Sequence, residues 1–378
     1  MREGEVWWRG KSFHPFHSLH SLTAWGVRGG VAVREVRFLL VGVGNVGRRF
    51  LEVVACKRDV LGGDLGLCLT FVGAADTSGI AVCPAGLDAG RVVELKSEGR
   101  GVAAYPQWGR PGVPAREMVQ TTGADLLLEA SPANLQDGQP GLSCIEAALS
   151  RGMHVVTANK APLVLTFPSL LALARRHGRQ LCFDATVAGG LPAVNLGQRD
   201  LAAATIHRLE GVLNLTANYI LTRMAQDGSS YDQALAEAQA AGHAEADPSL
   251  DVEGWDAASK LVILAHSVLG HPATLADVTV EGIAGIAAEN LQRAAAGGKR
   301  VKLVAAAEGD GDGYRLSVRP TRLEAGHPLA QLGATQMGIV YHTDIMGVIS
   351  AAIVEETPVP TAAAMLRDVI GIYRAGSA

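Results

Sequence analysis

A glycine-rich turn between a short apolar run and a helical pattern constrains this 378-residue chain more than any other feature. Residues 36–42 read VRFLLVG, which is typical of a buried strand, and GVGNVGRRFLEVV continues from the last glycine. Gly42, Gly44 and Gly47 fit the pattern G-x-G-x-x-G, with Asn45 and Val46 before the third glycine. These glycines permit a tight turn, a close approach to a pyrophosphate and close helix packing. The pattern predicts dinucleotide binding at a helix N-terminus, unless the turn serves packing alone.

Strand and helix patterns alternate after this turn, which indicates βαβ units and a parallel sheet covered on both faces. Strands are expected at residues 67–74, 125–130, 154–157 and 180–187, and helices at 142–150 and 168–177. The predicted fold class is α/β: a Rossmann-type, doubly wound parallel sheet with a second α+β domain for substrate binding and dimerisation.

Longer elements follow residue 203 and mark the second domain. Helices are expected at 231–241, 252–269 and 361–373, and strands at 301–307, 314–324 and 338–354. We therefore divide the chain into an N-terminal extension expected to be disordered (1–35), a dinucleotide-binding domain (36–160), a substrate-binding, catalytic and dimerisation domain (161–335), and a C-terminal segment that packs back on the dinucleotide-binding domain (336–378).

Composition excludes several classes of protein. With 48% hydrophobic and 19% charged residues, the chain is not disordered, and a net charge of −4 argues against nucleic acid as a partner. No apolar run approaches the length of a membrane span. The five cysteines are scattered without a C-x-x-C pair, which favours reduced thiols and a cytoplasmic location.

Two polar residues follow predicted strands at the edge where such sheets bind ligands. Asp76 ends the second strand, where its carboxylate would bond the ribose hydroxyls of NAD and repel the 2′-phosphate of NADP, so we lean towards NAD. A simple turn cap before Ser78 is an equally good interpretation of Asp76. Lys160 follows the strand at 154–157 and is expected in the ligand crevice, although a solvated surface lysine is the alternative.

The densest group of charged residues lies between Glu245 and Lys260. Asp251 is expected to cap a helix that is apolar nearly all round and therefore buried. Asp256 and Lys260, four residues apart, face the same way on that helix. An exposed i,i+4 salt bridge is the structural interpretation, but the apolar surroundings favour a functional pair.

Several motifs together resemble homoserine dehydrogenases, from about residue 36 to about residue 374. In the family's order they are GVGNVG, LLLEASPANLQDGQP, HVVTANKAPL, FDATVAGGLP, GVLNLTANYIL, GHAEADPSLDVEGWDAASKL, HPLA, TDIMG and PTAAAMLRDVI. The resemblance implies an NAD(P)-dependent oxidoreductase that interconverts L-homoserine and L-aspartate 4-semialdehyde in threonine and methionine biosynthesis. It also implies a homodimer.

The resemblance implies roles for individual residues. Lys260 matches the lysine that gives and takes the proton, and Lys160 matches the lysine between substrate and cofactor. Glu245 matches the carboxylate that holds the substrate ammonium group. Asp251, Asp256 and Thr216 complete the substrate site, and Ser131 joins the cofactor site.

A monovalent cation, Na⁺ or K⁺, is a further implication of the resemblance. Its ligands here would be Asp184, Val187, Gly189 and Leu191, largely through backbone carbonyls. Asp184 stands where the family usually has Glu, which shortens its reach to the cation. Leu215 replaces a usual Gly, and residues 355–359 replace a glycine-rich turn that covers the cofactor.

Two alternatives stay open on the sequence. Another amino-acid dehydrogenase of similar build is one; aspartate-semialdehyde dehydrogenase in particular would need an activated cysteine, and no cysteine here has a His within four residues in sequence. A non-catalytic dinucleotide-sensing module is the other, but it gives no reason for Lys160, Asp256 and Lys260 together. Two lysines converging on one oxygen suit alcohol oxidation, since one removes the hydroxyl proton and the other stabilises the alkoxide.

Overall fold

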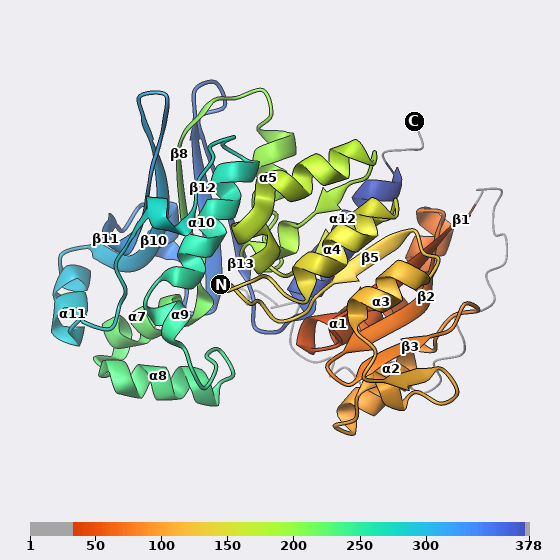
Figure 1. Ribbon diagram of the computed structural model, residues 1–378. Helices are drawn as coiled ribbons and strands as arrows, with labels where there is room; N and C mark the ends of the chain where they lie inside the picture. The colour runs from red at the N-terminus through yellow and green to blue at the C-terminus, as the bar shows by residue number, and fades with distance from the viewer. Residues whose placement is uncertain (1–32, 375–378) are drawn as a thin grey trace, which may run out of the picture.

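The computed structural model of the chain describes residues 33–374. The extension predicted at residues 1–35 lies outside the described residues except for its last three, and the first strand already begins at Arg34. Two domains lie side by side, the first built around one sheet and the second around another (Figure 1).

The first sheet has seven strands in the order β4-β3-β2-β1-β5-β6-β7. Their bounds are β1 Arg34–Val41, β2 Leu67–Asp76, β3 Gly79–Val82, β4 Gly109–Pro111, β5 Leu126–Glu129, β6 His154–Thr157 and β7 Leu181–Cys182. Strands β2, β1, β5, β6 and β7 are parallel, whereas β3 and β4 add an antiparallel edge. The doubly wound α/β fold predicted from the sequence is thereby confirmed.

Helices cover both faces of this sheet because alternate strand residues point to opposite sides. Leu39 and Val41 of β1 belong to the core shared with α3 (Ala115–Thr121), α4 (Gly141–Ser150) and α5 (Ala161–Arg176). Phe38 and Leu40 belong to the core shared with α1 (Asn45–Cys56), α2 (Ala89–Ser97) and α12 (Val359–Arg374). Buried residues on both faces explain why the run reads as continuously apolar.

The second sheet has six strands in the order β13-β12-β8-β10-β11-β9. The strands are β8 Ile206–Val212, β9 Val278–Val280, β10 Lys299–Asp310, β11 Gly313–Glu324, β12 Gln336–Thr343 and β13 Val348–Val354. The helices of this half are α6 Ala193–Asn195, α7 Leu215–Asp227, α8 Tyr231–Ala240, α9 Ser249–Val252, α10 Trp255–Ser267 and α11 Ala288–Ala296. Helices α7, α10 and α11 pack on β10. No described helix is both long enough and apolar enough to cross a membrane.

Helix α12 returns from the second sheet to the first domain, where it packs against α1 and β6 (Figure 1). Of the segment 336–378, α12 is the part that packs back, because β12 and β13 belong to the second sheet. The first sheet continues through β7, so the domain boundary predicted after residue 160 falls before its last strand.

Three predicted elements are wrong in detail. The strand expected at 180–187 stops at Cys182, because a 3₁₀ turn (Asp184–Thr186) and the positive φ of Ala188 end the extended backbone. The helix expected at 252–269 is broken at Gly254 (φ 91°), which begins α10. The strand expected at 338–354 is a hairpin, in which the N–H of Thr343 donates to the carbonyl of Gly347.

Candidate active site

A cleft of about 1270 Å³ opens at the carboxyl ends of β1, β5 and β6, between the two domains. Its walls include the glycine turn of residues 42–46 and the side chains of Lys160, Asp256 and Lys260. In doubly wound sheets this edge is where ligands bind.

The three glycines of the turn have the separate roles that the motif predicts. Gly42 has φ +89°, and a Cβ there would lie 2.4 Å from the backbone of Ala130. A Cβ on Gly47 would lie 2.1 Å from the carbonyl oxygen of Gly42, so the helix packs as closely as a glycine allows. Gly44 has no atom within 4 Å of its Cβ position, and it precedes the N-terminus of α1 at Asn45. This open backbone beside free N–H groups fits a pyrophosphate.

Asp76 lies on the cleft wall with its carboxylate already bonded within the chain. Its Oδ1 accepts from the N–H (2.9 Å) and hydroxyl (2.5 Å) of Ser78, and its Oδ2 accepts from Lys96 Nζ (2.7 Å). Burial alone would raise the pKa of Asp76, but the Lys96 ammonium and the bonds from Ser78 outweigh it and lower the pKa. Asp76 is therefore both a turn residue and a charge at the cleft, and Lys96 brings an opposite charge beside it.

The buried carboxylate of Glu129 lies beneath the wall of the cleft that contains Ser131. Glu129, at the end of β5, accepts from the hydroxyl and N–H of Ser131 and from the hydroxyl of Thr157 (2.9 Å). Asn159 joins this network through Ser131 Oγ (3.3 Å). Burial raises the pKa of Glu129, and the hydrogen bonds oppose that rise. The network orients Ser131, which lines the cleft.

In the same cleft, one carboxylate joins two lysines from different domains. Lys160, which precedes α5, donates to Oδ1 of Asp256, and Lys260 of α10 donates to Oδ2 at 2.7 Å. The three side chains are only 9–16% exposed. Burial would raise the pKa of Asp256, but the ammonium groups of Lys260 and Lys160 outweigh it and hold the pKa far below its usual range. The predicted i,i+4 pair is present, and Lys160 extends it across 96 residues of sequence.

Asp251 lies next to this ion cluster rather than at a helix cap. Its oxygens accept from Asn214 Nδ2 (2.7 Å) and from the Thr216 hydroxyl (3.0 Å), so the predicted capping role is wrong. Asn214 Nδ2 also donates to Asp256 Oδ2 at 2.7 Å and thus links the two aspartates. Burial and the charge of Asp256 raise the pKa of Asp251.

Glu245 is exposed on the wall of the same cleft and bonds none of these residues. It stands apart from the Asp251–Asp256 cluster, which leaves its carboxylate open to a ligand in the cleft. The geometry therefore brings together all the predicted catalytic and substrate residues, with Glu245 as the outermost.

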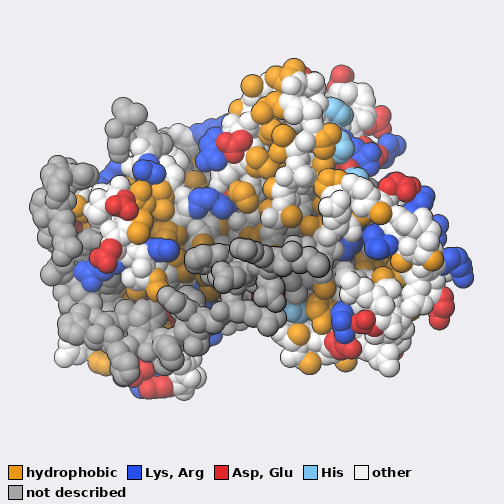
Figure 2. All heavy atoms as spheres, turned by 180° about the vertical axis from the view of Figure 1, so that it is seen from behind, with side chains coloured by type: hydrophobic (Ala, Val, Ile, Leu, Met, Phe, Trp, Pro, Cys, Tyr) orange, Lys and Arg blue, Asp and Glu red, His pale blue; other side chains and the backbone are white. Residues whose placement is uncertain are grey.

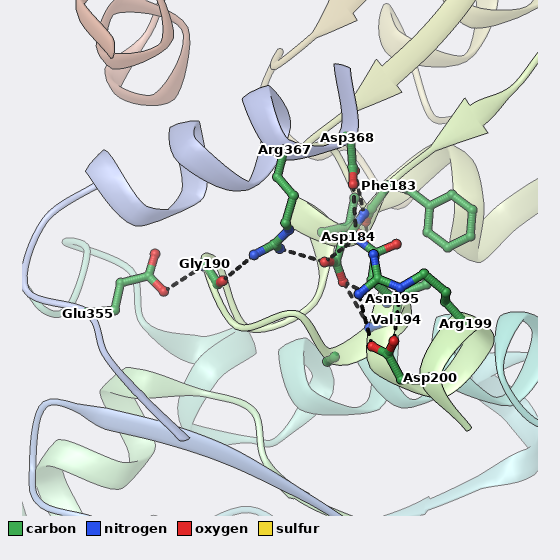
Figure 3. Close-up of polar contacts among 12 residues, drawn as sticks. Phe183, Asp184, Gly190, Val194, Asn195, Arg199, Asp200, Glu355, Arg367 and Asp368 are labelled. Atoms are coloured by element: carbon green, nitrogen blue, oxygen red, sulfur yellow. Dashed lines mark hydrogen bonds and ion pairs between the residues drawn. The ribbon is translucent and has the colours of Figure 1, made fainter. Parts of the chain in front are cut away.

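The residues predicted to hold a monovalent cation do not fit one. The buried carboxylate of Asp184 accepts from Val194 N–H (2.8 Å), Asn195 N–H (3.3 Å), Asn195 Nδ2 (2.8 Å) and Arg367 Nη2 (2.5 Å), as Figure 3 shows. Four donors fill the acceptor capacity of a carboxylate. Of the predicted backbone ligands, the Leu191 carbonyl accepts from the Ala193 N–H, while Val187 and Gly189 lie in the same loop. Among the described residues no three His, Cys, Asp or Glu side chains form a metal-binding group.

Sequence reasoning missed three residues that line the cleft, Lys96, Asn214 and Glu355, and the buried Glu129 behind it. Glu129 and Asn214 lie inside the motifs LLLEASPAN and GVLNLTANYIL. In each motif a charged or polar residue follows an apolar run, and this pattern could have indicated a functional side chain. Glu355 follows β13 and accepts from the Gly190 N–H at 3.1 Å. For Lys96, 20 residues from Asp76, no sequence signal was available.

A G-x-G-x-x-G turn and a lysine–carboxylate–lysine cluster that line one cleft are typical of a dinucleotide-dependent dehydrogenase. Comparison with known proteins gives the family. Residues 192–370 match the family model described as homoserine dehydrogenase. The homoserine dehydrogenase of Methanocaldococcus jannaschii is 36% identical over 335 residues, covering 89% of this chain and 98% of that protein. This chain belongs to the homoserine dehydrogenase family.

Two further relatives carry cofactor names. The NAD⁺-dependent homoserine dehydrogenase of Pseudomonas canavaninivorans is 34% identical over 345 residues, covering 91% of this chain and 97% of that protein. A solved structure of a hyperthermophilic archaeal homoserine dehydrogenase in complex with NADPH superposes with a TM-score of 0.77 at 27% identity, covering 90% of this chain and 98% of that one.

The sequence predicts that Lys260 transfers the proton, and this role can be tested by substitution. Lys260→Met keeps the apolar stem but removes the ammonium group, so kcat should fall roughly 10²–10⁴-fold while the protein stays folded. Steady-state kinetics and a thermal melt check this. Lys299→Met is the matched control, because Lys299 is exposed on β10 and pairs with Glu324 away from the cleft. A Lys260→Met enzyme within a few-fold of wild type would remove Lys260 from the mechanism.

Proposed function

We propose that this protein oxidises L-homoserine to L-aspartate 4-semialdehyde, and catalyses the reverse reduction, in threonine and methionine biosynthesis. The observation that carries the proposal is the Lys160–Asp256–Lys260 cluster facing the same cleft as the glycine turn. A non-catalytic sensing module would have no need of such a cluster, because burying charged side chains costs desolvation free energy.

The mechanism follows from the geometry of the cluster. A nicotinamide cofactor held at the glycine turn of Gly42, Gly44 and Gly47 would supply the hydride acceptor for oxidation of the carbon that carries the hydroxyl group. Lys260, in its neutral form, takes the hydroxyl proton, and the Lys160 ammonium stabilises the alkoxide oxygen as the C=O bond forms. Asp256 keeps both nitrogens on one side of the cleft, since each bonds one of its oxygens. The reverse reaction returns the proton from Lys260.

The direct test is an absorbance assay at the reduced-cofactor band with purified protein, L-homoserine and NAD or NADP. Reduction that needs L-homoserine, and that L-serine or L-threonine supports far more weakly, would bear out the proposal. Reduction without substrate preference would indicate another amino-acid dehydrogenase, and bound cofactor without turnover would indicate a sensing module.

Glu245 is proposed to hold the substrate ammonium group, because its carboxylate is on the cleft wall and bonds no side chain there. Glu245→Gln should therefore raise KM for L-homoserine about tenfold or more and leave KM for the cofactor within twofold. Glu253→Gln is the control and should change neither constant, because the Glu253 carboxylate is exposed in the same segment but outside the cleft. Equal rises in both constants would assign Glu245 a structural role.

Cofactor choice is proposed to favour NAD, because the carboxylate of Asp76 opposes a 2′-phosphate at the cleft wall. Lys96 partly neutralises that carboxylate at 2.7 Å. Wild-type kcat/KM should be at least about tenfold higher with NAD than with NADP. Asp76→Ser should narrow the gap, since it frees Lys96 to meet the phosphate, whereas Lys96→Met should widen it. A wild-type preference for NADP would make Asp76 a turn residue only.

A homodimer is proposed, with the β12–β13 hairpin in its interface. Large apolar side chains are exposed there: Ile345 (68%), Met346 (43%), Val348 (59%) and Val354 (51%). Figure 2 shows hydrophobic side chains gathered over this hairpin on the rear face. Edge strands with exposed apolar side chains favour self-association. A sedimentation mass equal to a single chain would contradict the dimer.

A cytoplasmic location is also proposed. All five cysteines are free thiols, and Cys68, Cys83 and Cys144 are buried in the core, which suits a reducing compartment. Recovery of the activity with the membrane or secreted fraction of the source cells, and not with the cytosol, would contradict this location.

A further inference from the structure

The C-terminal helix supplies a positive charge to the loop at residues 184–191. Arg367 of α12 donates from Nη2 to Asp184 Oδ2 (2.5 Å) and from Nη1 to the carbonyl of Gly190 (3.3 Å), as Figure 3 shows. The guanidinium group thus bonds a carboxylate and a backbone carbonyl of one short loop. These two kinds of oxygen are also the ligands through which a hard monovalent cation would bind.

The charges around Asp184 require such a group. Asp184 and Asp368 are both buried, and Asn195 Nδ2 donates to each of them (2.8 and 3.1 Å). Burial raises the pKa of Asp184, and Arg367 opposes that rise. Burial and the nearby Asp184 also raise the pKa of Asp368, to about 6. Without a cation, two carboxylates would share one amide group in a poorly solvated place.

The loop that Arg367 holds is part of the cleft. Ala185, Thr186 and Gly189 line it, although Asp184 itself does not. The peptide groups at Gly190 are held from both sides, since its N–H donates to Glu355 Oε2 (3.1 Å) and its carbonyl accepts from Arg367. Any movement of this loop therefore changes the wall that faces the cofactor and the substrate.

We propose that the Arg367 guanidinium takes the place of a monovalent cation, neutralising Asp184 and holding the loop at 184–191, so that this enzyme works without Na⁺ or K⁺. Arginine carries one permanent positive charge, as do these ions, and its fork bonds a carboxylate and a carbonyl at fixed geometry. Because the group is attached to α12, it is present at any salt concentration. Arg367 is accordingly a positioning residue, which acts on the cleft through the loop.

The first test uses the wild-type protein. Homoserine oxidation is measured in tetramethylammonium buffers free of Na⁺ and K⁺, and NaCl or KCl then replaces tetramethylammonium chloride at constant ionic strength, which keeps screening equal. We expect kcat and KM to change less than about threefold, a change that corresponds to about half the free energy of a tenfold change. A saturable activation larger than this by either ion would overturn it.

The second test creates the need for a cation. Arg367→Met should lose activity at least about tenfold in tetramethylammonium and regain most of it with Na⁺ or K⁺, and its melting temperature should rise with the same ions. The double variant Asp184→Asn/Arg367→Met should not respond to them, because the carboxylate charge is gone. Arg367→Lys, which keeps the charge, should remain independent of added ions.

The control is Arg199→Met. Arg199 lies near the loop in Figure 3 but bonds the exposed Asp200 at 3.0 Å, so its loss should produce no dependence on ions. If Arg367→Met loses activity and neither Na⁺ nor K⁺ restores it, Arg367 has a purely structural role and the proposal is overturned. Full activity of Arg367→Met without either ion would also overturn it. If Arg367→Met does not fold, the wild-type and Arg367→Lys titrations decide.

This inference rests on the proposed function for its kinetic readout, and the two can fail separately. A wild-type protein inactive with L-homoserine under every ion condition would contradict the proposed function. The thermal melts of Arg367→Met and of the double variant, with and without Na⁺, would then still decide the role of Arg367.

Discussion

The carboxylate of Asp256, bonded by two ammonium groups, is the interaction on which the candidate site depends. Lys160 comes from the edge of the first sheet and Lys260 from a helix of the second domain, and each takes one oxygen of Asp256. A buried carboxylate is costly without partners, so the pairing links domain arrangement to the position of both lysines. Asn214, which bonds Asp256 and Asp251, extends the same link to the start of α7.

The rest of the cleft is arranged around this cluster by the order of the strands. The glycine turn follows β1, Ser131 follows β5 and Lys160 follows β6, and these three strands are neighbours in the sheet. A dinucleotide held at the turn would therefore extend past Ser131 towards the lysines. The C-terminal helix closes the arrangement from behind, because Arg367 reaches from α12 to the loop that follows β7.

Local patterns predicted much of this from the sequence. The glycine turn, β6 and the pair Asp256–Lys260 depend on residues close together in the chain, and all three are found as expected. The contact of Lys160 with Asp256 could not be predicted from a local pattern, because the two residues are 96 positions apart. The contact of Arg367 with Asp184 joins residues 183 positions apart. Such pairs depend on how the domains pack. The surroundings of Asp184 show the same limit, because the motif FDATVAGGLP gives no sign that Arg367 will bond its carboxylate.

We propose that Asp256 positions the two lysines for catalysis. Measuring kcat and cofactor affinity of Asp256→Asn tests it most directly, with Asp247→Asn as control because Asp247 is exposed in the same segment and bonds only Ser249. We expect a kcat at least about 10²-fold lower for Asp256→Asn, with the Kd for the dinucleotide within threefold of wild type and Asp247→Asn unchanged. A kcat for Asp256→Asn within fivefold of wild type would contradict it.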